Sequence, residues 1–291
     1  MTIGNTYFVA TTGTPYTTVQ SAVSDINAGP APTVTNPAVI YVYPGTYVSS
    51  APIILPQYTS VVGIVKHAWG GVRFSNDTTD VFQCSGFNTF QNLTFVQGAT
   101  ASTWAVNVGN NTDVSVLDCA MYTLAGPGQQ QGLLSANGNL WARITVQDCI
   151  VNSLQTAGAV ISLINTTTAV RFCDTWIRNC FLDMYQLTGF GFAILTSGVQ
   201  DVRIESGCTL RGSGSASNLF TGVYLAKGAI TSGTPQVEVR HCYIGGNSVG
   251  VFNEAGTVMN ILNSDVAGAL TSGTQTVHNS YTGAHYNALP I

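Results

Sequence analysis

The sequence predicts an all-β protein folded as a parallel β-helix, a solenoid built from short strands with one short helix at its beginning. Three observations support this prediction. Only 8% of the 291 residues are charged, whereas 45% are hydrophobic. Short apolar runs alternate with Gly, Asn, Asp, Ser and Thr, as in strands separated by turns. One apolar pattern returns every 22 to 35 residues, the spacing of a solenoid, whereas a propeller blade needs about 40 to 50 residues.

The first predicted element is an amphipathic helix that ends near Asn27. Thr17 and Gln20 have the spacing of a helix capping box. One helix face is then apolar, at Val19, Ala22, Val23 and Ile26. We expect this helix to cover the first end of the solenoid, where an unpaired sheet edge needs a cap.

Short β runs follow the helix. Residues 38–43, 52–56 and 60–65 are rich in Val, Ile and Tyr, and Pro44 and Gly45 mark a turn between the first two. The sequence indicates three parts: an N-terminal segment with the capping helix (1–38), the β-helix (39–268) and a C-terminal cap or tail (269–291).

Seven later segments share a pattern of an apolar residue, a small or apolar residue three positions later, and an apolar residue two positions after that, and we expect these positions to face the core. The segments begin at Phe90, Val116, Val146, Phe172, Ile204, Val239 and Ile261. Their second positions are Leu93, Cys119, Cys149, Thr175, Gly207, Cys242 and Ser264, and their third positions are Phe95, Met121, Val151, Ile177, Thr209, Ile244 and Val266. The inward cysteines Cys119, Cys149 and Cys242 are interpreted as small buried apolar residues, with a nucleophilic thiol as the alternative.

The N-terminal order of elements resembles the pectate-lyase-like superfamily. The helix, the strand at 39–43, the turn at 44–47 and the runs at 53–56 and 60–63 have the order of its first coil, and residues 90–95 are similar to its usual coil sequence. The resemblance spans about residues 14–268 and implies a single-stranded right-handed parallel β-helix. That superfamily contains pectin lyases, esterases and hydrolases as well as phage tailspikes and other virion proteins.

The residue before each second pattern position forms a predicted turn column. Its members are Asn92, Asp118, Asp148, Asp174, Ser206, His241 and Asn263. These residue types tolerate left-handed backbone or form side-chain turns, so we favour a structural role like the asparagine ladder of the superfamily. The alternative is a cation site, because stacked carboxylates at Asp118, Asp148 and Asp174 are the ligands that calcium prefers.

The densest predicted charged patch lies on an outward sheet face. Equivalent residues of neighbouring coils stack about 4.8 Å apart, so Arg203 is expected on Glu238 and Glu205 on Arg240. If the protein is an enzyme, these four residues are the catalytic candidates, with Glu205 and Glu238 as the paired carboxylates of a glycosidase. The favoured interpretation is two cross-strand ion pairs, each contributing about 0.2 to 1 kcal/mol.

The first functional hypothesis is a virion structural protein, in which the β-helix is a non-catalytic building block of a capsid, fibre or tail. The sequence lacks the catalytic signatures of polygalacturonases and pectin methylesterases, and its scarcity of lysine suits a surface packed against neighbours. The alternatives are a polysaccharide lyase or glycoside hydrolase of the tailspike type, or a glycan-binding module. Aromatic residues that could stack on sugars are Tyr43, Tyr47, Trp69, Trp104, Trp141 and Trp176.

Composition indicates the expected partners. A net charge of −4 with nine Lys and Arg residues disfavours nucleic acid, and no run approaches the roughly 20 apolar residues of a membrane helix. No cofactor is expected. The expected partners are other virion proteins, further copies of the chain (as a trimer in related viral β-helices), or cell-surface polysaccharide. The first residues have no signal-peptide pattern, so we expect synthesis in the cytoplasm and assembly into a virion.

Overall fold

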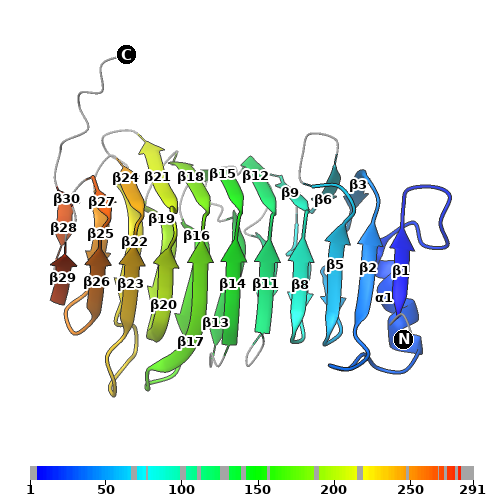
Figure 1. The fold of residues 1–291 in the computed structure, drawn as a ribbon, viewed down its shortest axis with the longest axis horizontal. Helices are drawn as coiled ribbons and strands as arrows, with labels where there is room; N and C mark the ends of the chain where they lie inside the picture. Colours follow the sequence, from blue (N-terminus) through cyan, green and yellow to red (C-terminus); the bar gives the residue numbers. More distant parts are fainter. Residues whose placement is uncertain are drawn as a thin grey trace, which may run out of the picture.

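The computed structural model describes a right-handed parallel β-helix with one helix at its N-terminal end (Figure 1). The predicted fold is therefore confirmed. The described residues are 5–66, 71–76, 78–98, 103–109, 113–124, 131–138, 142–155, 158–186, 190–214, 219–246, 249–267, 269–271, 274–278 and 281–282.

The strands form three parallel sheets that run along the solenoid. The first sheet contains β1 (Thr6–Val9), β2 (Ala38–Val42), β5 (Thr59–Gly63), β8 (Asn88–Gln91), β11 (Asp113–Leu117), β14 (Ala142–Gln147), β17 (Arg171–Arg178), β20 (Val199–Glu205), β23 (Gln236–Arg240), β26 (Val258–Leu262) and β29 (Thr274–His278). The second contains β3 (Gly45–Val48), β6 (Val72–Ser75), β9 (Thr94–Gln97), β12 (Ala120–Leu124), β15 (Ile150–Gln155), β18 (Phe181–Gln186), β21 (Thr209–Gly214), β24 (Tyr243–Gly246), β27 (Asp265–Val266) and β30 (Tyr281–Thr282). The third contains β4 (Ile53–Leu55), β7 (Phe82–Cys84), β10 (Thr103–Val108), β13 (Gln131–Gly138), β16 (Gly158–Asn165), β19 (Phe190–Ser197), β22 (Leu219–Ala226), β25 (Val249–Asn253) and β28 (Ala269–Thr271).

The helix α1 (Val19–Ala28) lies at the N-terminal end of the solenoid (Figure 1). Its predicted apolar face is buried, and the Thr18 side chain accepts a hydrogen bond from the backbone N–H of Ser21. Thr18 is therefore the N-cap, one residue after the predicted Thr17. Strand β1 precedes the helix and already pairs with β2 in the first sheet.

The core is a set of apolar columns inside the three sheets. Val116 pairs in register with Phe90 and with Val146, as the repeat predicts. The predicted register is wrong in the next coil, because Val146 pairs with Ile177 and not with Phe172. Phe172 instead points outward and is 53% exposed.

A second correction concerns the coil that begins at Ile204. Leu210 pairs with Leu182 and with Ile244, so Leu210 occupies the inward position that was predicted for Thr209. The coil accommodates one extra residue at its turn, where Ser206 and Gly207 both have positive φ angles of 59° and 81°. Glycine adopts this backbone conformation without the steric cost of a Cβ atom.

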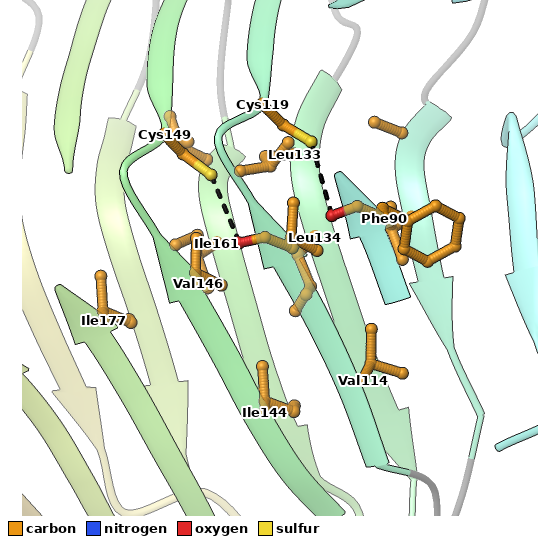
Figure 2. Packing of buried hydrophobic residues seen from close by; sticks show 14 of the residues in the cluster. Phe90, Val114, Cys119, Leu133, Leu134, Ile144, Val146, Cys149, Ile161 and Ile177 are labelled. Atoms are coloured by element: carbon orange, nitrogen blue, oxygen red, sulfur yellow. Dashed lines mark hydrogen bonds between the residues drawn. The ribbon is translucent and has the colours of Figure 1, made fainter. Parts of the chain in front are cut away.

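The buried thiols form a longer column than the repeat predicts. The cysteine ladder consists of Cys119, Cys149, Cys180, Cys208 and Cys242, all of them buried and free. Each thiol donates to a backbone carbonyl of the preceding coil, as Cys149 does to the carbonyl of Val116, and Figure 2 shows the bond from Cys119 to Phe90. Cys180 and Cys208 were missed because the two register errors displaced them.

Candidate functional site

The outer face of the first sheet changes character along the solenoid. One outward row carries small hydroxyl residues at Ser115 and Thr145 and continues as Trp176, Arg203 and Glu238 on β17, β20 and β23. These outward positions alternate with buried valines and isoleucines and with the buried Thr175, which is why successive coils present them on one surface. The predicted stacking of Arg203 beside Glu238 is present, and it lies where the hydroxyl row ends.

The ion pairs on this face differ from the predicted ones. Arg203 contacts Asp201 on its own strand, and its Nη1 lies 3.7 Å from Asp174 Oδ1 on β17. Glu238 pairs with Arg240, two residues along β23. The guanidinium of Arg203 therefore contacts the two aspartates, although Glu238 is its register neighbour.

The other predicted pair is also replaced. Glu205 Oε1 accepts a hydrogen bond of 2.8 Å from Arg178 Nε on β17, and Arg240 is held by Glu238. The predicted pairing of Glu205 with Arg240 is thus wrong. Residue 178 is next to Glu205 in register, and it was not aligned there because the predicted coil was displaced by five residues.

Asp174 is part of this charged network and not of the turn column. Its carboxylate contacts Arg143 at 3.3 Å and Arg203, and it accepts a 2.8 Å hydrogen bond from the indole Nε1 of Trp176. Arg143 also approaches Asp113 on β11 at 3.9 Å. Charges of opposite sign thus alternate from β11 to β23.

Trp176 is packed within this network. The guanidinium carbons of Arg178 and Arg203 lie 3.9 Å and 4.4 Å from the centroid of its ring. Arginine planes stack favourably on an indole, with a contribution of about 0.5 to 1 kcal/mol at exposed sites. The ring therefore holds the two arginines in place, which leaves Trp176 less able to act as a sugar platform.

A pocket opens next to this network. It has a volume of about 310 Å³ and is lined by Phe172, Gln200, Asp201, Val202, Arg203, Gln236 and Glu238. We call it the Arg203 pocket. Two predicted site residues, Arg203 and Glu238, line it, whereas Glu205 and Arg240 lie beside it without forming its wall.

A backbone irregularity shapes the Arg203 pocket. The register between β17 and β20 shifts between Phe172 and Thr175, and Asp201 has a φ of 66°. A bulge of this kind re-aims side chains and is common next to functional sites. Here it turns Asp201 outward beside Gln200, so both side chains reach the pocket.

Five pocket residues were not predicted from the sequence as site residues: Phe172, Gln200, Asp201, Val202 and Gln236. Asp201 was missed because nothing in the local pattern indicates a bulge. The exposed Phe172 was assigned to the core by the misaligned coil. A weak signal was available, because Gln200 and Asp201 are two consecutive polar residues that break the alternation of apolar and polar residues along β20.

The turn column is confirmed at six of its seven predicted positions. Asn92, Asp118, Asp148, Ser206, His241 and Asn263 all have φ angles between 49° and 59°, and the seventh member is Asn179 with a φ of 47°. Asn179 lies five residues after the predicted Asp174, so the correction follows from the same register error.

The two aspartates left in the column are not arranged as a cation site. Asp118 pairs with Lys66 Nζ at 2.9 Å. Asp148 accepts hydrogen bonds from Gln147 and Asn179, and these bonds hold the pKa of its carboxyl below the ordinary value. Among the described residues, no group of three or more His, Cys, Asp or Glu side chains is placed to hold a metal ion.

The predicted aromatic residues are dispersed. Tyr47 is only 6% exposed and donates to the carbonyl of Tyr43, which is 39% exposed at the N-terminal end. Trp104 is half-buried on β10 in the third sheet, away from the Arg203 pocket. Trp69 and Trp141 lie outside the described residues.

The cysteines have no accessible thiol with which to attack a substrate. All seven are free and buried. Burial raises the pKa of the Cys119 thiol well above its ordinary value, with the neighbouring Cys149 as a further cause. A thiol buried in apolar surroundings is inert, so the structural interpretation of the ladder holds.

Comparison with solved structures gives the fold class. A pectin methylesterase from Aspergillus niger is similar over 99% of this chain and 88% of its own, with 13% identity and a TM-score of 0.57. PemA, a pectin methylesterase from Erwinia chrysanthemi, covers 99% and 92% of the two chains, with 13% identity and a TM-score of 0.49. A rhamnogalacturonan lyase covers 92% and 75%, with 12% identity and a TM-score of 0.48.

No protein-family model and no curated protein matches the chain. The protein thus has the pectin-lyase-like right-handed parallel β-helix fold, and the resemblance stated from the sequence is confirmed at the level of fold. In the part of the chain that the structure describes, no helix has the length and apolarity needed to cross a membrane.

Proposed function

We propose that this protein binds a polysaccharide chain along the outer face of the first sheet, at the Arg203 pocket. The observation that carries the proposal is the pocket itself, in which Arg203, Asp201, Glu238 and two glutamines lie beside the exposed ring of Phe172. Sugars present hydroxyl groups and apolar C–H faces together. A concave site with convergent polar groups and an aromatic rim can bind both.

The shape of the sheet supports an extended ligand. Outward residues of adjacent coils repeat about every 4.8 Å, so the face offers a regular row of side chains. Upstream of the Arg203 pocket, this row contains Ser60, Thr89, Ser115 and Thr145. Hydroxyl groups donate and accept hydrogen bonds, so a chain bound in the pocket could continue along this row.

The fold comparison favours carbohydrate as the ligand. The Aspergillus niger protein is by name a pectin methylesterase, and its fold is similar to that of this chain. At 13% identity the likeness concerns the fold, so the choice of carbohydrate depends on the pocket as well. The sequence hypothesis of a virion structural protein has less support than its polysaccharide alternative, and the virion partners and location stay predictions.

Hydrolysis of the bound chain is a second candidate function. Asp201 and Glu238 line one pocket, and two carboxylates about 5 to 9.5 Å apart are what glycosidases use. Glu205, the other predicted carboxylate, is held by Arg178 beside the pocket. Asp201 therefore replaces Glu205 as the partner proposed for Glu238.

The test combines binding and turnover on a polysaccharide panel. We expect Arg203→Gln to weaken binding by about tenfold or more, because hydrogen bonds to charged groups contribute about 1.5 to 3 kcal/mol. Arg211→Gln is a matched control, since Arg211 also pairs with an aspartate (Asp183, 2.9 Å) and lies over an aromatic ring, but on the second sheet. Equal loss in both variants would place the ligand elsewhere.

Release of reducing ends or of unsaturated sugars tests the enzymatic candidate on the same panel. Turnover that is lost in both Asp201→Asn and Glu238→Gln would establish the two carboxylates as the catalytic pair. Binding without turnover would identify a glycan-binding protein. An absence of binding to every polymer would overturn the proposed function.

A further inference from the structure

We propose that the Arg203 pocket selects uncharged polysaccharides over acidic ones. This inference depends on the proposed function, and it adds the class of ligand. It is drawn from the charge balance of the outer face of the first sheet. It does not follow from the fold, since solved structures with this fold include enzymes named for pectin.

The described outward side chains around the pocket carry nearly equal numbers of positive and negative charges. The guanidiniums are Arg143, Arg178, Arg203 and Arg240, and the carboxylates are Asp113, Asp174, Asp201, Glu205 and Glu238. The net charge of these nine side chains is therefore −1. Including Arg171, at the beginning of β17, would raise this net charge only to zero. This face has no positive excess.

Each of the four guanidiniums already has a carboxylate within ion-pair distance. Arg203, the cation of the pocket, contacts Asp174 and Asp201, and its side chain is only 32% exposed. An acidic sugar would have to compete with these two carboxylates for one guanidinium. It would also approach Glu238 in the same pocket, at the energetic cost of like charges in close contact.

An uncharged sugar meets no such competition. Its hydroxyls can donate to Asp201 or Glu238 and accept from Arg203 while every ion pair stays in place. The amides of Gln200 and Gln236 in the pocket wall add neutral donors and acceptors. The network thus offers many hydrogen-bonding groups at fixed positions, and its net charge is close to zero.

The whole molecule adds to this preference. The chain carries a net charge of −4, and only two of its residues are lysines, Lys66 and Lys227. Lys66 is already paired with Asp118 of the turn column. An acidic polymer would therefore be repelled on approach, most strongly at low ionic strength.

The experiment uses the full chain and polymer pairs that share a backbone and differ in charge. The pairs are methyl-esterified and de-esterified polygalacturonate, hydroxyethyl and carboxymethyl cellulose, and dextran and dextran sulfate. Affinity electrophoresis compares the binding of the two members of each pair, and calorimetry measures the dissociation constant of any polymer that binds. We expect the uncharged member to bind at least tenfold more tightly, with an affinity that salt barely changes and that Arg203→Gln lowers.

A charge-reversing variant tests the physical reason. Asp201→Asn combined with Glu238→Gln changes the balance of this face from −1 to +1, and we expect it to gain affinity for the acidic polymers that falls as salt is added. The control is Asp183→Asn combined with Asp265→Asn, which makes the same change in total charge on the second sheet. Equal gains in both variants would show that net charge acts without the pocket, and this would overturn the inference.

The outcomes separate the two proposals. Tighter binding of the acidic members would overturn the inference but leave polysaccharide binding standing, provided that Arg203→Gln weakens it. Binding of uncharged members that Arg203→Gln does not affect would reject the pocket as the site. No binding by any of the six polymers would overturn both proposals.

Discussion

At the residue scale, the left-handed backbone at each turn explains which side chains recur there. Asn and Asp tolerate this conformation, and their side chains also bond to neighbouring coils. Asn179 does both, since its Nδ2 donates 2.6 Å to Asp148 Oδ1 while its φ is 47°. Asp174, which the repeat pattern placed here, instead lies on β17 among arginines.

Alanine and glycine variants distinguish these two positions. At position 179 we expect alanine to be less stable than glycine by about 1 kcal/mol, because only glycine adopts a positive φ without steric cost. Both variants lose the bond to Asp148. Residue 174 lies on a strand and has no positive φ, so at this position we expect the alanine variant to be more stable than the glycine variant. Chemical denaturation of the four variants measures both differences, and the same order at both positions would contradict the corrected alignment.

At the scale of elements, the register of the coil that contains β17 determines which residues line the Arg203 pocket. β17 is eight residues long, and the apolar pattern of the repeat fits both from Phe172 near its beginning and from Ile177 near its end. The neighbouring coils select the frame that begins at Ile177, since Ile177 pairs with Val146 and with Ile204. Phe172 is thereby left outward at the edge of the Arg203 pocket. A local pattern cannot choose between two matching registers, because the choice depends on strands that are about 30 residues away in the chain.

The cysteine ladder is a second feature at this scale. Its five thiols follow the turn column on consecutive coils and donate to carbonyls of the preceding coil. We expect no cysteine of the native protein to react with a maleimide within minutes at neutral pH, because all seven are buried. In denaturant all seven should react, as counted by mass spectrometry. Fast labelling of ladder residues in the native protein would show that the turns between the first and second sheets open locally.

At the scale of the whole molecule, the solenoid needs its ends covered. Helix α1 buries Val19, Ala22, Val23 and Ile26 against the first coil, where an open end would expose apolar side chains and sheet edges. The opposite end is formed by β28, β29 and β30 (Figure 1). The predicted division into three parts remains a prediction, and residues 283–291 of the proposed tail lie outside the described residues.

A charge on the buried face of the helix tests this covering role. We expect Val23→Asp to destabilise the protein by several kcal/mol, because it buries an unpaired carboxylate in the first coil. Ser24→Asp is the control, since Ser24 is the next residue on the same helix and is exposed. Thermal unfolding measures stability and sedimentation measures association. A Val23→Asp protein as stable and as monodisperse as the control would show that the helix is dispensable.

Local sequence patterns are sufficient to predict the β-helix, the capping helix and six of the seven turn positions. These features are set by residues a few positions apart: alternation along a strand, spacing on one helix face, and residue types that accept left-handed backbone. Other features depend on contacts between coils: the partners of Arg203 and Glu205, the role of Asp174, and the existence of the Arg203 pocket. Long charged side chains select partners among three adjacent coils, and a single bulge changes which of them meet. Such contacts are determined only when the coils are stacked.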